Sequence, residues 1–143
     1  MRLISPDVEE GGSLSTIHGY KFDNLSPGLA WSDVPAAAAS LVLTLVDTHP
    51  VARGYVHWFV DGIPPVDGSF ERGAGGAVPF GREIRPYAGP FPPSGTHDYV
   101  FTIYVLDASA PELSARASVE DVETGAADHI LERATLQTMF TKP

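Results

Sequence analysis

The sequence predicts a mostly β protein that forms a single domain over residues 1–143. Three apolar runs of strand length carry this prediction: Ser40–Val46, Tyr55–Ile63 and Tyr99–Leu106. The first two runs have apolar residues on both faces, as expected at the covered centre of a sandwich rather than in an exposed sheet. A series of strands followed by one late helix is typical of mostly β folds.

The first half of the chain is rich in turn-forming residues between these runs. We expect short pairing segments at Leu14–Ile17 and Leu29–Trp31. The residues Asp47–Pro50 are expected to form a turn that leads into an extended segment. From Pro64 to Pro86 the sequence has neither helical nor strand periodicity, which predicts a long loop that is functional or mobile.

The last third of the chain contains the only helical pattern. A short helical or turn segment is expected near Leu113, and Ser118–Val122 indicates a helix start or a loop. The clearest predicted helix is Val122–Ala134, because apolar residues recur there at i, i+3, i+4 and i+7. Thr135–Phe140 is then expected to form a closing strand.

Composition excludes several classes of function. Eighteen acidic residues against nine basic ones give a net charge of −9, and the basic residues are scattered, so nucleic acid and anionic membrane surfaces are not expected partners. Without cysteine there is no disulfide, thiolate nucleophile or cysteine-bound zinc. No run approaches the roughly 18 apolar residues of a membrane span, and no apolar signal segment follows the start of the chain. We expect a cytoplasmic protein.

The loop Tyr87–Gly95 indicates a recognition site. It holds three prolines and two glycines, which fix its path, so little entropy is lost when a ligand binds. His97 and Tyr99 follow it and share one face if a strand has begun there. Asp47, at the end of one predicted strand, and His57, within another, are expected neighbours if these strands pair.

Two rival chemistries and one plainer interpretation remain open. Ser94, His97 and Asp98 have the residue types of a nucleophile triad, but adjacent His97 and Asp98 point to opposite faces of a strand, and no Gly-x-Ser-x-Gly turn is present. Asp47, His57 and His97 form an open three-ligand metal set without a His-Glu-x-x-His spacing. Taken alone, Asp47 is more often a turn residue and His57 a core histidine. We expect no enzyme activity, no metal and no cofactor.

Four segments in order resemble the phosphatidylethanolamine-binding protein family, in its short Raf kinase inhibitor-like form from bacteria and archaea. Asn24–Trp31 resembles the family's Asn-Val-Ser-Pro-Pro-Leu-Ser-Trp, and Asp47–Pro50 stands where the family has Asp-Pro-Asp-Ala-Pro. Val56–Val60 resembles Val-His-Trp-Val-Val. Tyr87–Phe101 resembles Tyr-Gly-Gly-Pro-Cys-Pro-Pro-Pro-Gly followed, after a variable insert, by His-Arg-Tyr-Val-Phe. The order and spacing together make the resemblance specific.

The resemblance implies a β-sandwich of two antiparallel sheets with Greek-key connections and a C-terminal α-helix. It also implies a small pocket for anions such as phosphate, a carboxylate or a phospholipid headgroup, and, in some relatives, a kinase or protease partner. The residues that it assigns to this pocket are Asp47, His57, Gly89, Pro90, His97 and Tyr99.

Protonated histidines, the Tyr99 hydroxyl and the loop amides are the expected donors to such an anion. Asp47 would fix a histidine tautomer or accept an ethanolamine-like ammonium. Phosphate affinity is therefore expected to weaken as the pH rises from about 6 to about 8. The chain departs from the family pattern at His49, Phe91 and Asp98, which bears on the identity of the ligand. The alternative is a module that docks a phosphorylated or acidic group of a partner protein, and homodimerisation is also open.

Overall fold

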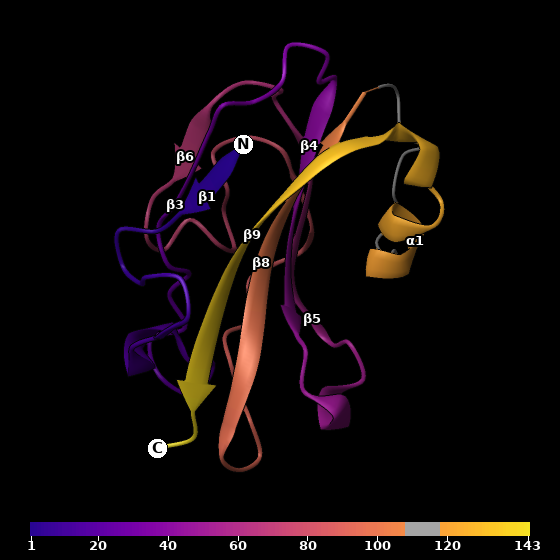
Figure 1. Cartoon of the computed structure of the whole chain (residues 1–143). Helices are drawn as coiled ribbons and strands as arrows, with labels where there is room; N and C mark the ends of the chain where they lie inside the picture. Colours follow the sequence, from indigo (N-terminus) through magenta and orange to yellow (C-terminus); the bar gives the residue numbers. More distant parts are fainter. Residues whose placement is uncertain (108–117) are drawn as a thin grey trace.

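The computed structural model describes residues 1–107 and 118–143, which form two β-sheets packed face to face (Figure 1). Within these residues no helix is both long and apolar enough to cross a lipid bilayer. The elements in chain order are β1 (Arg2–Ile4), β2 (Gly12–Ser13), η1 (Thr16–His18), β3 (Leu29–Ser32), β4 (Ser40–Asp47), η2 (Pro50–Ala52), β5 (Val56–Ile63), β6 (Gly68–Phe70), β7 (Arg82–Arg85), β8 (Thr96–Leu106), α1 (Val119–Glu123), η3 (Ala127–His129) and β9 (Ile130–Thr141).

The smaller sheet has the strand order β1-β3-β6, and the larger sheet has the order β2-β9-β8-β4-β5-β7. All strand pairs are antiparallel except β2 with β9. The predicted mostly β sandwich is therefore confirmed, as are the three strong strands. The central strands β4, β5 and β8 end or begin together at the lower end of the molecule in Figure 1.

Two apolar layers explain why the central strands are apolar on both faces. The inner layer lies between the sheets and contains Trp31, Trp58 and Phe70, each at most 2% exposed. The outer layer lies on the other face of the larger sheet, where Phe59 packs in one cluster with Val122 of α1. Burial on both sides stabilises these strands through the hydrophobic effect and fixes their register.

The predicted helix Val122–Ala134 is wrong over most of its length. Ser118 starts α1, because its hydroxyl accepts from the Asp121 amide while the Asp121 carboxylate accepts from the Ser118 amide. The helix ends at Glu123, and β9 begins at Ile130. The spacing of apolar residues fits a helix locally, but eleven paired positions with β8 decide the conformation of this segment.

Smaller differences from the expected elements also have physical reasons. The predicted loop 64–86 contains β6 and β7, two short strands that add to sheet edges and are too brief to show a period. In place of the pairing expected at Leu14–Ile17, a strand lies at Gly12–Ser13 and a 3-10 turn at Thr16–His18. Where an extended segment was expected to follow the turn Asp47–Pro50, the residues Pro50–Ala52 form a 3-10 turn. The segment expected near Leu113 lies outside the described residues, and α1 precedes the closing strand.

Candidate functional site

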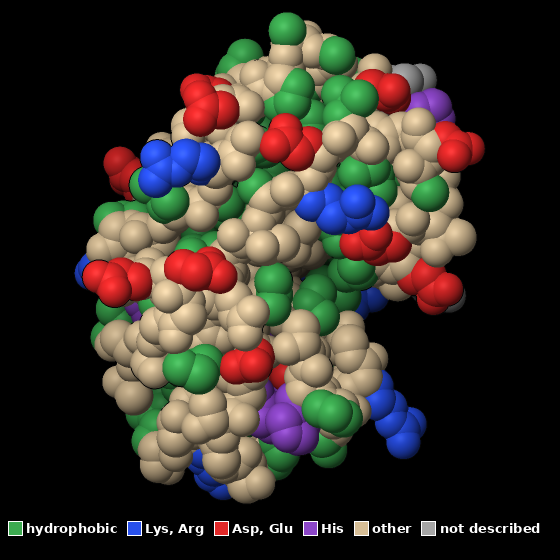
Figure 2. Space-filling model, viewed as in Figure 1, with side chains coloured by type: hydrophobic (Ala, Val, Ile, Leu, Met, Phe, Trp, Pro, Cys, Tyr) green, Lys and Arg blue, Asp and Glu red, His purple; other side chains and the backbone are tan. Residues whose placement is uncertain are grey.

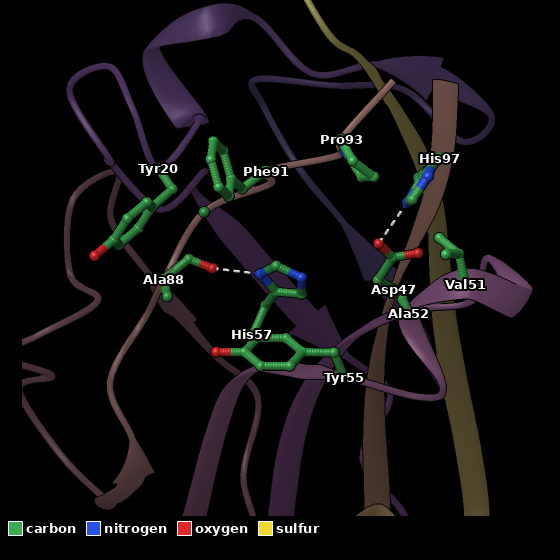
Figure 3. A pocket seen from close by; sticks show the side chains of 11 residues that line it. Tyr20, Asp47, Val51, Ala52, Tyr55, His57, Ala88, Phe91, Pro93 and His97 are labelled. Atoms are coloured by element: carbon green, nitrogen blue, oxygen red, sulfur yellow. Dashed lines mark hydrogen bonds and ion pairs between the residues drawn. The ribbon is translucent and has the colours of Figure 1, made fainter. Parts of the chain in front are cut away.

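A cavity of about 540 Å³ opens at the end of the sandwich where β4 ends and where β5 and β8 begin (Figure 3). Three polar ionisable side chains, Asp47, His57 and His97, lie in a wall that is otherwise mostly hydrocarbon and aromatic. The structure thus brings together an acid and two imidazoles that are far apart in the sequence. The other lining residues are Tyr20, Val51, Ala52, Tyr55, Ala88, Gly89, Phe91 and Pro93.

The pairing of β4 with β8 brings Asp47 next to His97. Asp47 lies opposite Tyr99 in the sheet, and His97, two residues earlier, shares the inner face with Tyr99. The His97 Nδ1 atom donates to Asp47 Oδ2 over 2.7 Å, and both side chains are buried. The His49 amide donates to the other carboxylate oxygen over 2.8 Å. Both oxygens of the buried carboxylate are therefore satisfied, and the orientation of the His97 ring is fixed.

A β-bulge directs His57 toward the same place. Trp58 pairs with Leu45 but Val56 pairs with Val46, so His57 is an extra residue in β5. The bulge changes the side on which residues point, since Val56 packs in the outer layer and Trp58 in the inner one. The His57 ring then meets the Tyr99 ring edge-on at 5.3 Å between centroids.

The protonation state of His57 follows from its surroundings. Its Nδ1 atom donates to the Ala88 carbonyl over 2.7 Å, which leaves Nε2 as the nitrogen that can meet a ligand. Figure 3 shows this second nitrogen turned toward the side of the cavity that holds Asp47. Burial lowers the pKa of His57, and this effect outweighs the Ala88 carbonyl and the Asp47 charge, which act to raise it. At neutral pH the ring is uncharged, and Nε2 is an acceptor.

The Gly89–Pro90 loop builds the wall without offering amides to a ligand. The Gly89 amide donates to Asn24 Oδ1 over 2.7 Å, and the Pro90 carbonyl accepts from the Tyr20 amide over 3.0 Å. Pro90 has no N–H and does not line the cavity. The expectation that loop amides donate to an anion is therefore wrong, because the one amide available is already used.

Tyr99 supports the site from behind the wall. Its side chain is fully buried and does not line the cavity. Its hydroxyl lies near the Asp47 carboxylate and the Phe91 amide but makes no hydrogen bond of normal geometry with the described residues. Burial raises the pKa of Tyr99, and the nearby Asp47 charge raises it further, so the phenol stays protonated. Its hydroxyl is not placed to meet a ligand in the cavity.

Replacing Tyr99 by phenylalanine tests this assignment. Because the change removes a buried hydroxyl that makes no hydrogen bond of normal geometry and keeps the ring against His57, the free energy of unfolding is expected to rise by about 1 kcal/mol. The affinity for an anion is expected to stay within about twofold, since the hydroxyl is buried behind the cavity wall. Urea unfolding and calorimetric titration measure the two quantities, and a clear loss of affinity would show that the hydroxyl reaches the ligand.

Sequence reasoning missed most of the cavity mouth. Tyr20 comes from the turn-rich first segment, and Val51 and Ala52 come from η2, where no motif marks them. His49, a departure from the family pattern, stacks on His97 with 3.9 Å between ring centroids. The aromatic residue Tyr55, two positions before His57, was the one available signal for the mouth.

The described residues do not form the geometry of either rival site, the nucleophile triad or the three-ligand metal site. Ser94 does not line the cavity, and Asp98 reaches toward Gln137 across the sheet rather than toward His97. In the part of the chain that the structure describes, no three His, Cys, Asp or Glu side chains are grouped as a metal site.

Both fold and sequence place the chain among known proteins. Over residues 4–141 the sequence matches the family described as phosphatidylethanolamine-binding protein. The chain belongs to this family. The UPF0098 protein YbhB of Escherichia coli is 36% identical over 99% of this chain and 100% of its own length. A UPF0098 protein of Methanothermobacter thermautotrophicus is 34% identical over 99% of each chain.

A solved structure agrees with this membership. The phosphatidylethanolamine-binding protein homologue CT736 of Chlamydia trachomatis superposes with a TM-score of 0.85 at 27% identity, covering 99% of this chain and 97% of its own. Escherichia coli YbcL, at 24% identity, has the same fold with a TM-score of 0.85 over 99% of this chain and 98% of its own. The names of these two solved structures refer to the phosphatidylethanolamine-binding protein family, and the ligand of this chain has to be argued from its own cavity.

Proposed function

We propose that the cavity binds one small anionic group, a phosphate, a phosphorylated headgroup or a carboxylate, and that the protein acts by binding rather than by catalysis. One observation carries the proposal. In both His57 and His97 the Nδ1 atom is held by an acceptor within the protein, so each imidazole has one nitrogen left for a ligand in the same cavity. A protonated imidazole donates a charge-assisted hydrogen bond from that nitrogen to an anion.

The charge around the mouth favours this proposal. The chain carries a net charge of −9, but two basic residues lie near the cavity. Arg53 follows directly after the lining residues Val51 and Ala52 of η2. The Lys21 ammonium lies 5.0 Å from the centroid of the Phe91 ring, which also lines the cavity. Figure 2 shows basic and histidine side chains at the lower end of the molecule, where the cavity lies. The two donors held by Asp47 stabilise its carboxylate, and each of its oxygens already accepts a hydrogen bond within the protein.

An NMR titration with inorganic phosphate and with phosphoethanolamine tests the proposal. The ring signals of His57 and His97 are expected to shift together and to give one dissociation constant. His129, which pairs with Asp107 outside the cavity, is the internal control and is expected not to shift. The variant His57→Gln should weaken binding and His129→Gln should not. Unchanged signals at both cavity histidines would refute the proposal.

The same donors suit a phosphorylated or acidic side chain of a partner protein. Val51 is 60% exposed and Tyr55 is 56% exposed at the mouth, so a partner could contact them while its charged group enters the cavity. A Raf kinase inhibitor-like role in the cytoplasm, acting on a kinase or a protease, belongs to this second proposal. A pull-down that free phosphate reverses would favour it over a small ligand.

A further inference from the structure

The mouth of the cavity is aromatic, whereas its polar groups lie deeper. Tyr20, Tyr55 and Phe91 line the cavity and are 52%, 56% and 56% exposed. Tyr20 and Phe91 face each other at 6.0 Å between centroids with their planes tilted by 53°. Figure 3 shows these two rings on one side of the His57 ring and Tyr55 on the other. Three half-exposed rings at one opening leave aromatic surface that no part of the described chain covers.

The size of the cavity exceeds what the anionic group alone requires. Its volume of about 540 Å³ falls in the range of pockets that hold drug-sized molecules and is far larger than a phosphate ion. Asp47, His57 and His97 occupy only one part of the wall. The remaining space is bordered by ring and hydrocarbon surfaces, so a bare anion would leave most of this apolar wall in water.

Phe91 is presented in a fixed position. It lies between Pro90 and Pro92, and the Pro90 carbonyl is held by the Tyr20 amide. The Lys21 ammonium lies over the Phe91 ring. Because this segment is already ordered, a ligand that stacks on the ring loses little free energy in arranging it. The sequence has phenylalanine here where the family pattern has cysteine, so the Phe91 ring is a departure from that pattern.

We propose that the natural ligand is an aromatic anion, an aryl phosphate or an aryl carboxylate, whose charged group meets His57 and His97 while its ring packs against Phe91 and Tyr20. This inference rests on the proposed anion binding and adds the chemical class of the ligand. Ring–ring contacts add to the burial of apolar area, so an aryl group is favoured over an alkyl chain of similar size. The phosphorylated headgroup of a lipid, which lacks an aromatic ring, is therefore the less favoured ligand.

Isothermal titration calorimetry with three probes tests the ligand class. Phenyl phosphate is expected to bind about tenfold more tightly than inorganic phosphate and about threefold more tightly than hexyl phosphate. In Phe91→Ala the affinity for phenyl phosphate should fall by about tenfold, while the affinity for inorganic phosphate should fall by less than about twofold. Phe91→Leu, which keeps hydrocarbon volume, should reduce the preference of phenyl over hexyl phosphate.

Phe22→Leu is the matched control, since Phe22 is 49% exposed and does not line the cavity. It is expected to leave all three affinities unchanged. If inorganic phosphate binds but phenyl phosphate binds no better, or if hexyl phosphate binds best, the aromatic class is refuted and the anion pocket stands. If none of the three probes binds, the proposed function fails as well.

Discussion

Replacement of Gly89 by alanine is expected to lower the free energy of unfolding by about 3 kcal/mol and to disrupt the cavity. A β-carbon at this position would lie 2.0 Å from the His18 carbonyl oxygen and 2.9 Å from the Tyr20 amide nitrogen. Both contacts are with backbone, so neither can move aside as a flexible side chain would. Relief requires the loop to shift, and the loop also holds His57 through Ala88.

Urea unfolding followed by the fluorescence of the two buried tryptophans, Trp31 and Trp58, measures this effect. The control is Gly95→Ala, later in the same loop, where a β-carbon would meet nothing within 4 Å. Its backbone angle φ of +64° still strains an alanine, so a loss of about 1 kcal/mol is expected. Equal losses in the two variants would contradict the close approach seen at Gly89.

Sulfate affinity is expected to fall by about tenfold for each unit of pH above the pKa of His57 in the free protein. Burial lowers this pKa below the ordinary histidine value of 6.5, so the ring loses its proton at a lower pH than an exposed histidine does. Since only the protonated ring donates to an anion, affinity is highest at acid pH and decreases as the pH rises. The decline in affinity therefore begins below pH 6.5.

Calorimetric titrations with sulfate between pH 5 and 8 measure this dependence, because the charge of sulfate is constant over the histidine range. His57→Gln is expected to remove about one unit from the slope of log Kd against pH, and His129→Gln to leave the slope unchanged. A flat profile in the unmodified protein would show that His57 does not supply a proton to the bound anion.

The strands that could be predicted are those whose burial is visible in the sequence itself. Ser40–Val46 and Tyr55–Ile63 have apolar residues on both faces, and each lies in a strand covered on both faces. Ile130–Ala134 was wrongly predicted as part of a helix, because its apolar spacing fits a helix as well as a strand. Only pairing with β8, more than twenty residues away, distinguishes the two.

For the site, the sequence predicted the identity of the cavity residues better than the contacts that orient them. The resemblance pointed to Asp47, His57 and His97, and the structure places all three in one wall. The inward direction of His57 depends on a bulge, which the alternation of residues does not reveal. The Gly89 amide cannot donate to a ligand because it already donates to Asn24, 65 residues earlier in the chain. Such contacts arise from tertiary packing, which local patterns do not encode.

The bonds that close the cavity join distant parts of the chain, with Asn24 held to Gly89 and His18 to Tyr87 across 65 and 69 residues. The binding site therefore does not form in the unfolded chain, so a ligand binds and stabilises only the native state. At a concentration one hundred times its dissociation constant, any ligand adds about 2.7 kcal/mol to stability. A rise in melting temperature can thus identify the physiological compound in a library of metabolites, with no activity assay.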